Sequence, residues 1–256
     1  MESSTASEKK KLKRREILEK KKATDQILKA ASAQIDHLAS FPSFRCFNRN
    51  GLCLHLESGH GDKLSHCTKQ YIQNLLKVNM EGPYGSEWAI EEKVKRREMV
   101  APEARYIFVC RNANDMMDSA PIPLLGFLHY RFTLEEEMPV LYLYELQLDS
   151  SVQGKGLGKF LMELIELIAQ EKWMSAVVLT VQKSNSSAMK FYRSKLRYVV
   201  SSISPSRVNP FAGVEKKYEI LCKTFDHEAK AVLEVKKQTP CQNCFQYHLT
   251  TLKVLD

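Results

Sequence analysis

The stretch Gln153-Gly154-Lys155-Gly156-Leu157-Gly158 decides the fold class, because of the patterns on either side of it. A strand-like segment, 140–148, precedes it, so a strand passes through a glycine-rich turn directly into a helix N-terminus. Such a turn offers unpaired backbone N–H groups and the positive end of a helix dipole to an anion. Glycines let the backbone approach that anion closely. The helix itself is indicated by apolar residues of helical period at Leu157, Phe160, Leu161, Leu164 and Ile168.

Two other phosphate-binding loops fit the stretch less well. A P-loop requires Gly-x-x-x-x-Gly-Lys-Ser/Thr, but here Lys159 is followed by Phe160. A dinucleotide loop requires Gly-x-Gly-x-x-Gly and an acidic residue about 20 positions further on. Here the third glycine comes one residue early, and the next strand ends at 180–183 without an acid. A plain turn with three glycines is the remaining alternative.

Length and composition indicate a soluble globular protein. A chain of 256 residues can bury one good core with tails, and 44% hydrophobic and 27% charged residues are ordinary for this class. An apolar run of about 18 residues, which a membrane-spanning helix needs, is absent. The N-terminus lacks both an apolar secretion segment and a glycine at position 2 for myristoylation. We therefore expect no membrane partner.

The positive charge is concentrated at the N-terminus. Residues 1–29 hold ten bases and five acids, a net +5 of the total +8, so the remainder carries only +3. A solvated tail or helix is the plain interpretation of residues 1–25. The alternative is a basic arm that targets the nucleus or contacts nucleic acid or the ribosome.

The seven cysteines are odd in number and mostly scattered, which predicts reduced thiols in a nuclear or cytoplasmic protein. Cys241 and Cys244 form a single CxxC near the C-terminus. A structural zinc needs four ligands in paired spacing, so we expect no metal.

The order of predicted elements is typical of an α/β or α+β sheet with helices on both faces. The two strands that flank the helix 157–171 should be parallel, because a helix connects them. A turn is expected at 82–85, with Ser86 capping the helix after it. From Asp226 onward no element is predicted. Helices are expected near 27–38, 64–80, 86–99, 157–171 and 186–196; strands near 105–110, 124–132, 139–148, 176–181, 197–203 and 214–222; and a short strand or loop at 44–56.

One carboxylate stands out in the strand 140–148. Strict alternation places Glu145 and Gln147 on one face with Leu141 and Leu143. A carboxylate in line with two leucines is poorly solvated, and desolvation makes it a better base. The alternative is a Glu at a strand end that faces water or a basic partner.

The loop resembles the pyrophosphate-binding loop of the GNAT family of N-acetyltransferases, whose pattern is Arg/Gln-x-x-Gly-x-Gly/Ala. A second segment, Asn185-x-x-Ala188-x-x-Phe191-Tyr192, resembles the family's next signature. The resemblance implies a mixed central sheet whose two parallel strands splay apart, acetyl-CoA as co-substrate, and Asn185 on the pantetheine arm. Arg197-Tyr198 departs from the Gly-Phe common in the family. The cofactor-binding residues implied are Gln147, Leu148, Asp149, Gln153, Gly154, Lys155, Gly156, Leu157, Gly158, Lys159, Phe160 and Asn185.

A narrower resemblance covers roughly residues 40–222. The segments 142–148, 155–161, 179–181 and 218–221, with Asn48-Arg49-Asn50-Gly51, look like the NatD group of this family, which acetylates histone tails beginning Ser-Gly-Arg-Gly. It implies a catalytic domain over 26–222, followed by a C-terminal tail over 223–256, and a monomer that works on histone tails in nucleus and cytoplasm. The catalytic residues implied are Glu145, Tyr84 and Tyr192, and the substrate-binding residues are Tyr84, Trp88, Glu135, Tyr142, Tyr144, Thr180 and Tyr218.

Two features of this resemblance bear on substrate choice and mechanism. Glu135 is implied to face the substrate arginine, but Thr133 stands where a further acid is expected, and Glu136 and Glu137 are candidates to compensate. Glu145 would take the amine proton, a freed backbone N–H of the strand 140–148 would hold the oxyanion, and Tyr192 would protonate the leaving thiolate. The alternatives are acetylation of lysine side chains or another amine, and a non-catalytic acyl-CoA-binding scaffold.

Overall fold

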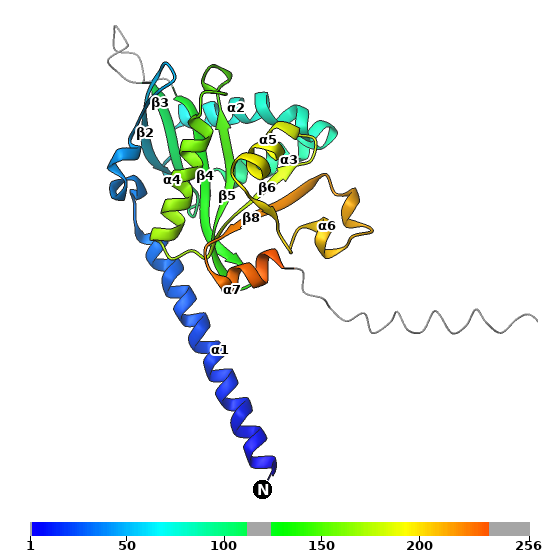
Figure 1. The fold of residues 1–256 in the computed structure, drawn as a ribbon. Helices are drawn as coiled ribbons and strands as arrows, with labels where there is room; N and C mark the ends of the chain where they lie inside the picture. The colour runs from blue at the N-terminus through cyan, green and yellow to red at the C-terminus, as the bar shows by residue number, and fades with distance from the viewer. Residues whose placement is uncertain (1, 112–123, 236–256) are drawn as a thin grey trace, which may run out of the picture.

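A central mixed sheet organises the protein, whose computed structural model describes residues 2–111 and 124–235 (Figure 1). The described strands form an eight-stranded sheet in the order β1-β2-β3-β4-β5-β6-β8-β7. Only β5 and β6 pair in parallel within it. The strands are β1 (Cys46–Arg49), β2 (Leu52–His60), β3 (Arg105–Arg111), β4 (Leu124–Glu135), β5 (Met138–Leu148), β6 (Ala176–Gln182), β7 (Val199–Val200) and β8 (Tyr218–Thr224).

Helices cover both faces of the sheet, as the sequence predicts. The end of α1 packs with α4 and α5 on one face, whereas α2 and α3 pack on the other. The α/β fold class and the parallel strand pair are thereby confirmed. The helices are α1 (Glu2–Ala33), α2 (His66–Tyr84), α3 (Trp88–Glu98), α4 (Leu157–Glu171), α5 (Ser186–Lys190), α6 (Pro205–Val208) and α7 (His227–Ala229). None of these helices is both long and apolar enough to cross a membrane.

The helix α4 anchors the fold, and its bounds match the predicted helix 157–171. Its apolar stripe, including Leu157, Leu161 and Leu164, is completely buried against the sheet. Such burial supplies most of the free energy that holds an amphipathic helix in place. Because α4 connects β5 to β6, its N-terminus lies at the carboxyl end of β5, where those two strands diverge.

The parallel strands separate after a short paired stretch. Their register runs from Val140↔Ala176 to Leu143↔Leu179 and then stops, although both strands continue. The residues of β6 beyond this point, from Thr180, remain paired with β8 on the other side. The predicted splaying of the two strands is confirmed, and it leaves the backbone of β5 after Leu143 without a partner in β6.

A β-bulge interrupts β5 at Tyr144. His129 of β4 pairs with Glu145, but the next residue, Tyr130, pairs with Leu143, so Tyr144 is an extra residue in β5. An extra residue shifts every later side chain to the opposite face. The expectation that Glu145 shares a face with Leu143 is therefore wrong.

Several predicted boundaries differ from the structure. The helix predicted over 64–80 continues through Pro83 and ends at Gly85, whose φ of 57° favours glycine, so no separate turn forms at 82–85. Ser86 does not cap α3, because a 3₁₀ turn at Gly85–Glu87 precedes that helix. The segment 44–56 contains two paired strands rather than one. The strand expected over 197–203 is reduced to Val199–Val200, because the chain turns away after this pair.

The predicted domain boundaries also fall inside continuous elements. Residue 25 lies within α1, whose N-terminal end projects away from the body in Figure 1, whereas Lys20 further along forms an ion pair with Glu228 of α7. Residue 222 lies within β8, and the chain continues into α7 and a π-helical turn, Lys230–Glu234. Ala229 and Leu233 of this segment are fully buried in a core cluster, so the domain extends past 222. The CxxC at Cys241 and Cys244 lies outside the described residues.

Candidate functional site

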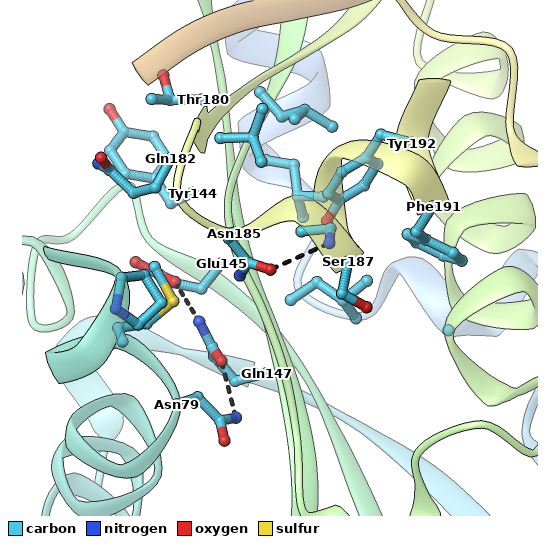
Figure 2. Close-up of a pocket in the computed structure, with 18 of the residues that line it drawn as sticks. Asn79, Tyr144, Glu145, Gln147, Thr180, Gln182, Asn185, Ser187, Phe191 and Tyr192 are labelled. Atoms are coloured by element: carbon cyan, nitrogen blue, oxygen red, sulfur yellow. Dashed lines mark hydrogen bonds between the residues drawn. The ribbon is translucent and has the colours of Figure 1, made fainter. Parts of the chain in front are cut away.

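A cleft of about 1250 Å³ opens where β5 and β6 diverge. Figure 2 shows residues from α2, both strands and the α5 segment meeting around it. Most of the residues singled out in the sequence come together here. Those that line the cleft are Tyr84, Glu135, Tyr142, Tyr144, Glu145, Gln147, Leu148, Gln153, Gly154, Gly156, Gly158, Lys159, Thr180, Asn185, Tyr192 and Tyr218.

One end of the cleft is built for an anion. Gly154 and Gly156 have φ of 73° and 85°, a conformation that a residue with a Cβ adopts only at a cost. Gly156 precedes α4, and no side-chain hydrogen bond caps this helix among the described residues. The backbone N–H groups of the first turn therefore face the cleft with the positive end of the helix dipole. This arrangement fits the diphosphate of coenzyme A, with Lys159 beside it.

Four predicted cofactor-binding residues do not line the cleft. The carboxylate of Asp149 accepts hydrogen bonds from Ser151, which lower its pKa and close the turn before the loop. The side chains of Leu157 and Phe160 lie on the buried face of α4, so these residues can offer only their backbone to a ligand. The carbonyl of Lys155 accepts a 2.9 Å hydrogen bond from the Asn50 amide, which pins the loop to the turn between β1 and β2.

The second signature holds the opposite wall of the cleft. The Asn185 side chain accepts a 3.0 Å hydrogen bond from the backbone N–H of Ala188 and caps α5. This cap orients the next turn, which carries Phe191 and Tyr192 into the cleft. Burial, with a smaller contribution from the charge of Glu145, raises the pKa of Tyr192 well above its ordinary value. The Tyr192 hydroxyl is therefore neutral near pH 7.

Glu145 lies at the bottom of the cleft and is held by both carboxylate oxygens. It is 7% exposed. Its Oε1 lies 2.9 Å from the ammonium of Lys95, and its Oε2 accepts a 2.8 Å hydrogen bond from the Gln147 amide. Gln147 in turn accepts a 3.0 Å hydrogen bond from Asn79 of α2 (Figure 2). A network that reaches into two helices fixes this carboxylate toward the cleft.

Lys95 is the charged partner that the sequence analysis missed. Its ammonium also lies 3.1 Å from the carboxylate of Glu98. Burial alone would lower the pKa of Lys95, but the charges of Glu145, Tyr84 and Glu98 outweigh this effect and raise the pKa above its ordinary range. Lys95 is therefore a permanent cation beneath the proposed reaction centre.

Tyrosines form the walls on the strand side of the cleft. The hydroxyl of Tyr142 lies 2.6 Å from that of Thr180, which bridges the diverging strands. The ring of Tyr144 stacks on His129 at 4.8 Å and lies under the guanidinium of Arg131 at 4.4 Å. Burial raises the pKa of Tyr142 to about 12, so its hydroxyl is neutral at ordinary pH.

Trp88 does not reach the cleft, although the sequence analysis expected it there. Its indole is buried in the core between α2, α3 and the sheet. The ring centroid lies 5.9 Å from that of Tyr84, which does line the cleft. Trp88 therefore supports Tyr84 from behind and makes no wall itself.

The rim of the cleft is acidic. Glu135 lines it, and burial together with the charge of Glu136 raises the pKa of Glu135. Glu136 and Glu137 do not line the cleft, because both have positive φ in the exposed turn between β4 and β5. The sequence did not predict two further sources of acids in the lining, which are Glu91 and Glu98 of α3 and Glu87 of the 3₁₀ turn before it. The carboxylate of Glu87 lies 2.9 Å from the ammonium of Lys217.

The missed residues carried a signal in the sequence. Asn79 lies on the same helical stripe as the buried residues Ile72, Leu75 and Leu76. Lys95 lies seven residues after Trp88 and four before Met99, both buried. A polar residue on an apolar stripe needs a buried partner, and both side chains find one at β5.

Comparison with known proteins identifies a family match that spans about half of the chain. Residues 70–196 match the acetyltransferase (GNAT) family. Among solved structures, PaiA N-acetyltransferase from Thermoplasma acidophilum in complex with coenzyme A is 18% identical, with 66% of this chain and 99% of that chain covered and a TM-score of 0.45. NAA60 of Arabidopsis thaliana with a bisubstrate analogue is 12% identical, with 67% and 99% covered and a TM-score of 0.46. Naa50 of Arabidopsis thaliana with the bisubstrate analogue CoA-Ac-MVNAL is 17% identical, with 66% and 99% covered and a TM-score of 0.41.

Proposed function

Since the chain belongs to the GNAT acetyltransferase family, whose members use acetyl-CoA, we propose that it acetylates the N-terminal α-amino group of histone tails that begin Ser-Gly-Arg-Gly. The observation that carries the proposal is the buried, doubly held carboxylate of Glu145 at the bottom of a tyrosine-walled cleft with an acidic rim.

The residues present fit acetyl-CoA, which supplies the acetyl thioester when it is bound. The uncapped N-terminus of α4 with Gly154 and Gly156 would hold the diphosphate, and the wall capped by Asn185 would flank the pantetheine arm. After Leu143, β5 stays paired with β4 but has no partner on the side of β6, so backbone N–H groups on that side would be available to the developing oxyanion.

Glu145 would act as the general base on the incoming amine. An α-amino group has a pKa of about 7.7–8, so it needs only modest help to lose a proton near neutral pH. Both carboxylate oxygens of Glu145 keep a free lone pair beside their contacts with Lys95 and Gln147. Tyr192, which lines the cleft, would donate the proton of its hydroxyl to the leaving sulfur.

The acidic rim supports a basic peptide as substrate. Glu135 from β4 and Glu91 from α3 line the same cleft, and a guanidinium that enters would find carboxylates from both elements. A small first residue suits the space between Tyr84, Tyr142 and Thr180. Thr133 also lines this end, so the arginine subsite has one acid fewer than the NatD resemblance implies.

Mass spectrometry of peptides incubated with enzyme and acetyl-CoA tests the proposal. A Ser-Gly-Arg-Gly peptide with a free α-amine should gain one acetyl group, whereas the same peptide with a blocked α-amine should gain none. A peptide with Ala in place of Arg should react more slowly, by about tenfold for each 1.4 kcal/mol of lost rim contacts. The variant Glu145→Gln should bind acetyl-CoA normally and lose most of its turnover.

The alternatives give different results in the same experiment. Acetylation of an internal lysine on the blocked peptide would favour a side-chain acetyltransferase. Binding of acetyl-CoA without turnover on either peptide would favour a non-catalytic scaffold. Either outcome would refute the proposed reaction and leave the family assignment untouched.

The basic arm supports a second, separate proposal. From residue 8 to 22 of α1 every described side chain is exposed, and most of the bases lie there. We propose that this arm contacts nucleic acid or the ribosome in nucleus and cytoplasm. Its positively charged side chains would be attracted to the phosphates of the nucleic-acid backbone. Fluorescence anisotropy with an RNA hairpin should show salt-dependent binding, which should weaken when Lys20, Lys21 and Lys22 are replaced by Gln. Equal binding by this variant would contradict the proposal.

A further inference from the structure

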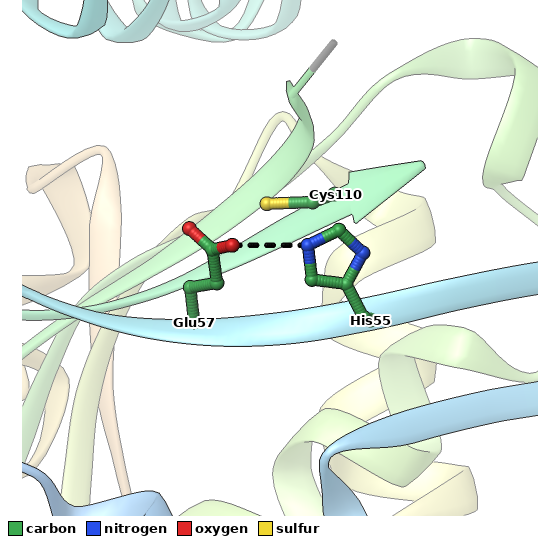
Figure 3. Close-up of side chains that lie close together, drawn as sticks. All are labelled: His55, Glu57 and Cys110. Carbon is green, nitrogen blue, oxygen red and sulfur yellow. Dashed lines mark hydrogen bonds and ion pairs between the residues drawn. The ribbon is translucent and has the colours of Figure 1, made fainter. Parts of the chain in front are cut away.

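Three side chains with metal-ligand chemistry converge away from the cleft. His55 and Glu57 lie two residues apart on β2, and Cys110 lies on β3 directly opposite His55 in the register. All three point to one face of the sheet, as Figure 3 shows. One nitrogen of His55, a carboxylate oxygen of Glu57 and the sulfur of Cys110 lie within 4.8 Å of one another. None of them lines the cleft or takes part in the proposed reaction.

The donor atoms of the three side chains face one another. The imidazole Nε2 of His55, which lies 3.0 Å from a carboxylate oxygen of Glu57, is the ring nitrogen turned toward the cluster in Figure 3. The other ring nitrogen, Nδ1, is buried without a hydrogen-bond partner among the described residues and points away from the cluster. The thiol of Cys110 is 1% exposed. The carboxylate of Glu57 is more than half exposed, so one side of the cluster is open to solvent.

We propose that His55, Glu57 and Cys110 bind one zinc ion that ties β2 to β3, with water as the fourth ligand on the open side. Nitrogen, oxygen and sulfur donors in one set are typical of Zn²⁺, which favours four ligands in a tetrahedron. At bond lengths of about 2.0–2.3 Å, ligand atoms in such a site lie roughly 3.3–3.8 Å apart. Small side-chain rotations would bring the three groups to that spacing.

The charges of the proposed site balance. When zinc binds, the thiol of Cys110 releases its proton to solvent and the sulfur forms the metal bond as a thiolate. The thiolate and the carboxylate of Glu57 then neutralise the two charges of the ion, and the imidazole of His55 binds as a neutral ligand. A neutral complex suits a half-buried position on the sheet, because it leaves no unpaired charge away from water.

The site would act on stability rather than on acetyl transfer. This proposed zinc site departs from the sequence-based expectation of no metal, which rested on the single CxxC at Cys241 and Cys244. The sequence separates Cys110 from His55 by 55 positions, and only the pairing of β2 with β3 brings them together. Zinc bound here would link β2 to β3, on the side of β4 that is away from the cleft.

Zinc titration of the full chain tests the proposal. The protein should carry Cys241→Ser and Cys244→Ser, so that the CxxC cannot supply a second zinc site, and should be stripped of metal first. Calorimetry should then show one zinc per chain, and zinc should raise the melting temperature. The variants Cys110→Ser, His55→Ala and Glu57→Gln should each weaken binding more than about a hundredfold, since loss of an outer-shell partner alone costs 10–100-fold. Cobalt, used as a coloured substitute, should show a thiolate charge-transfer band that Cys110→Ser abolishes.

Replacement of a thiol outside the cluster serves as the control. Cys67 is an exposed thiol on α2, so Cys67→Ser should bind zinc as tightly as the parent. Glu57 is exposed, so Glu57→Gln keeps the fold intact even where a change at the buried Cys110 disturbs it. If the parent binds no zinc, or if Glu57→Gln and His55→Ala bind as well as Cys67→Ser, the three residues are an ordinary core thiol beside a surface ion pair.

Discussion

Replacement of Lys95 by Met probes the ion pair beneath the proposed reaction centre. Met keeps most of the length and volume of the lysine stem but removes its charge. The carboxylate of Glu145 would then keep its hydrogen bond from Gln147 and lose its only described cation. Since Lys95 is 15% exposed and Glu145 7%, little water is available to replace that cation.

The size of the effect follows from the burial of the pair. Removal of one partner from a buried ion pair costs about 3–5 kcal/mol, because the other charge stays behind uncompensated. We expect the lower end, about 3 kcal/mol, since Glu145 also faces the open cleft and water can approach from that side. For a chain of this size each 1 kcal/mol lowers the melting temperature by about 2–4 °C, so the loss should be about 6–12 °C.

Thermal unfolding and steady-state kinetics measure the two consequences. Lys95→Met should also lower kcat/KM for the peptide by at least about tenfold, because the carboxylate loses the contact that orients it, while the affinity for acetyl-CoA stays unchanged. Lys93→Met is the matched control, since Lys93 lies on the same helix with its side chain exposed. Its unfolding free energy should change by less than about 0.5 kcal/mol.

A double-mutant cycle separates the pair from the rest of the helix. Lys95→Met strands the carboxylates of both Glu145 and Glu98, and Glu145→Gln removes the more deeply buried of the two charges, so the double variant should recover much of the lost stability. If Lys95→Met melts and turns over like Lys93→Met, or if the double variant is as unstable as the sum of both single changes, the ion pair does not hold Glu145 and the reasoning fails.

Two further predictions concern the loop and the core. Gly156→Ala should raise the KM for acetyl-CoA by about tenfold, since a Cβ at φ 85° costs about 1–2 kcal/mol, whereas Gly82→Ala, where no atom lies within 4 Å of the added Cβ, should leave KM unchanged. Burial lowers the pKa of His37 to about 4, while the unfolded chain takes up this proton near 6.5, so stability is lost as the pH falls through that interval. Urea unfolding should show that His37 accounts for about 2 kcal/mol of the unfolding free energy lost between pH 7.5 and pH 5. The variant His37→Gln should be less stable at every pH but should lack this pH-dependent part. An unchanged dependence of its unfolding free energy on pH would contradict the assignment to His37.

The parts of the fold that the sequence predicted correctly are those with local signals. The helix α4 follows from a buried stripe of residues at helical spacing, and the anion-binding turn follows from glycines at the positions that now show positive φ. The parallel pairing of β5 and β6 follows from the helix between them. Each of these features depends on residues close together in the chain.

The parts that sequence reasoning missed depend on contacts between distant segments. The length of α2 could not be read from Gly82 and Pro83, because the packing of this helix on the sheet sustains its last turn. The partnership of Lys95 with Glu145 joins residues 50 positions apart. The stripe on which Lys95 lies predicts a buried partner, but it does not say which strand provides it.

The bulge at Tyr144 shows how a local sequence pattern and a contact between distant segments together set the orientation of one side chain. With strict alternation, Glu145 would share a face with Leu141 and Leu143 and point into the hydrophobic core under α4, away from Lys95. The extra residue turns Glu145 to the side of Lys95 and keeps Leu146 against that core. The bulge lies next to the point where the pairing of β5 with β6 ends. One added residue therefore redirects the carboxylate at the place where the cleft that it faces opens. A local pattern can place a strand and a loop, but the orientation of this side chain depends on the register with β4, which no pattern within β5 contains.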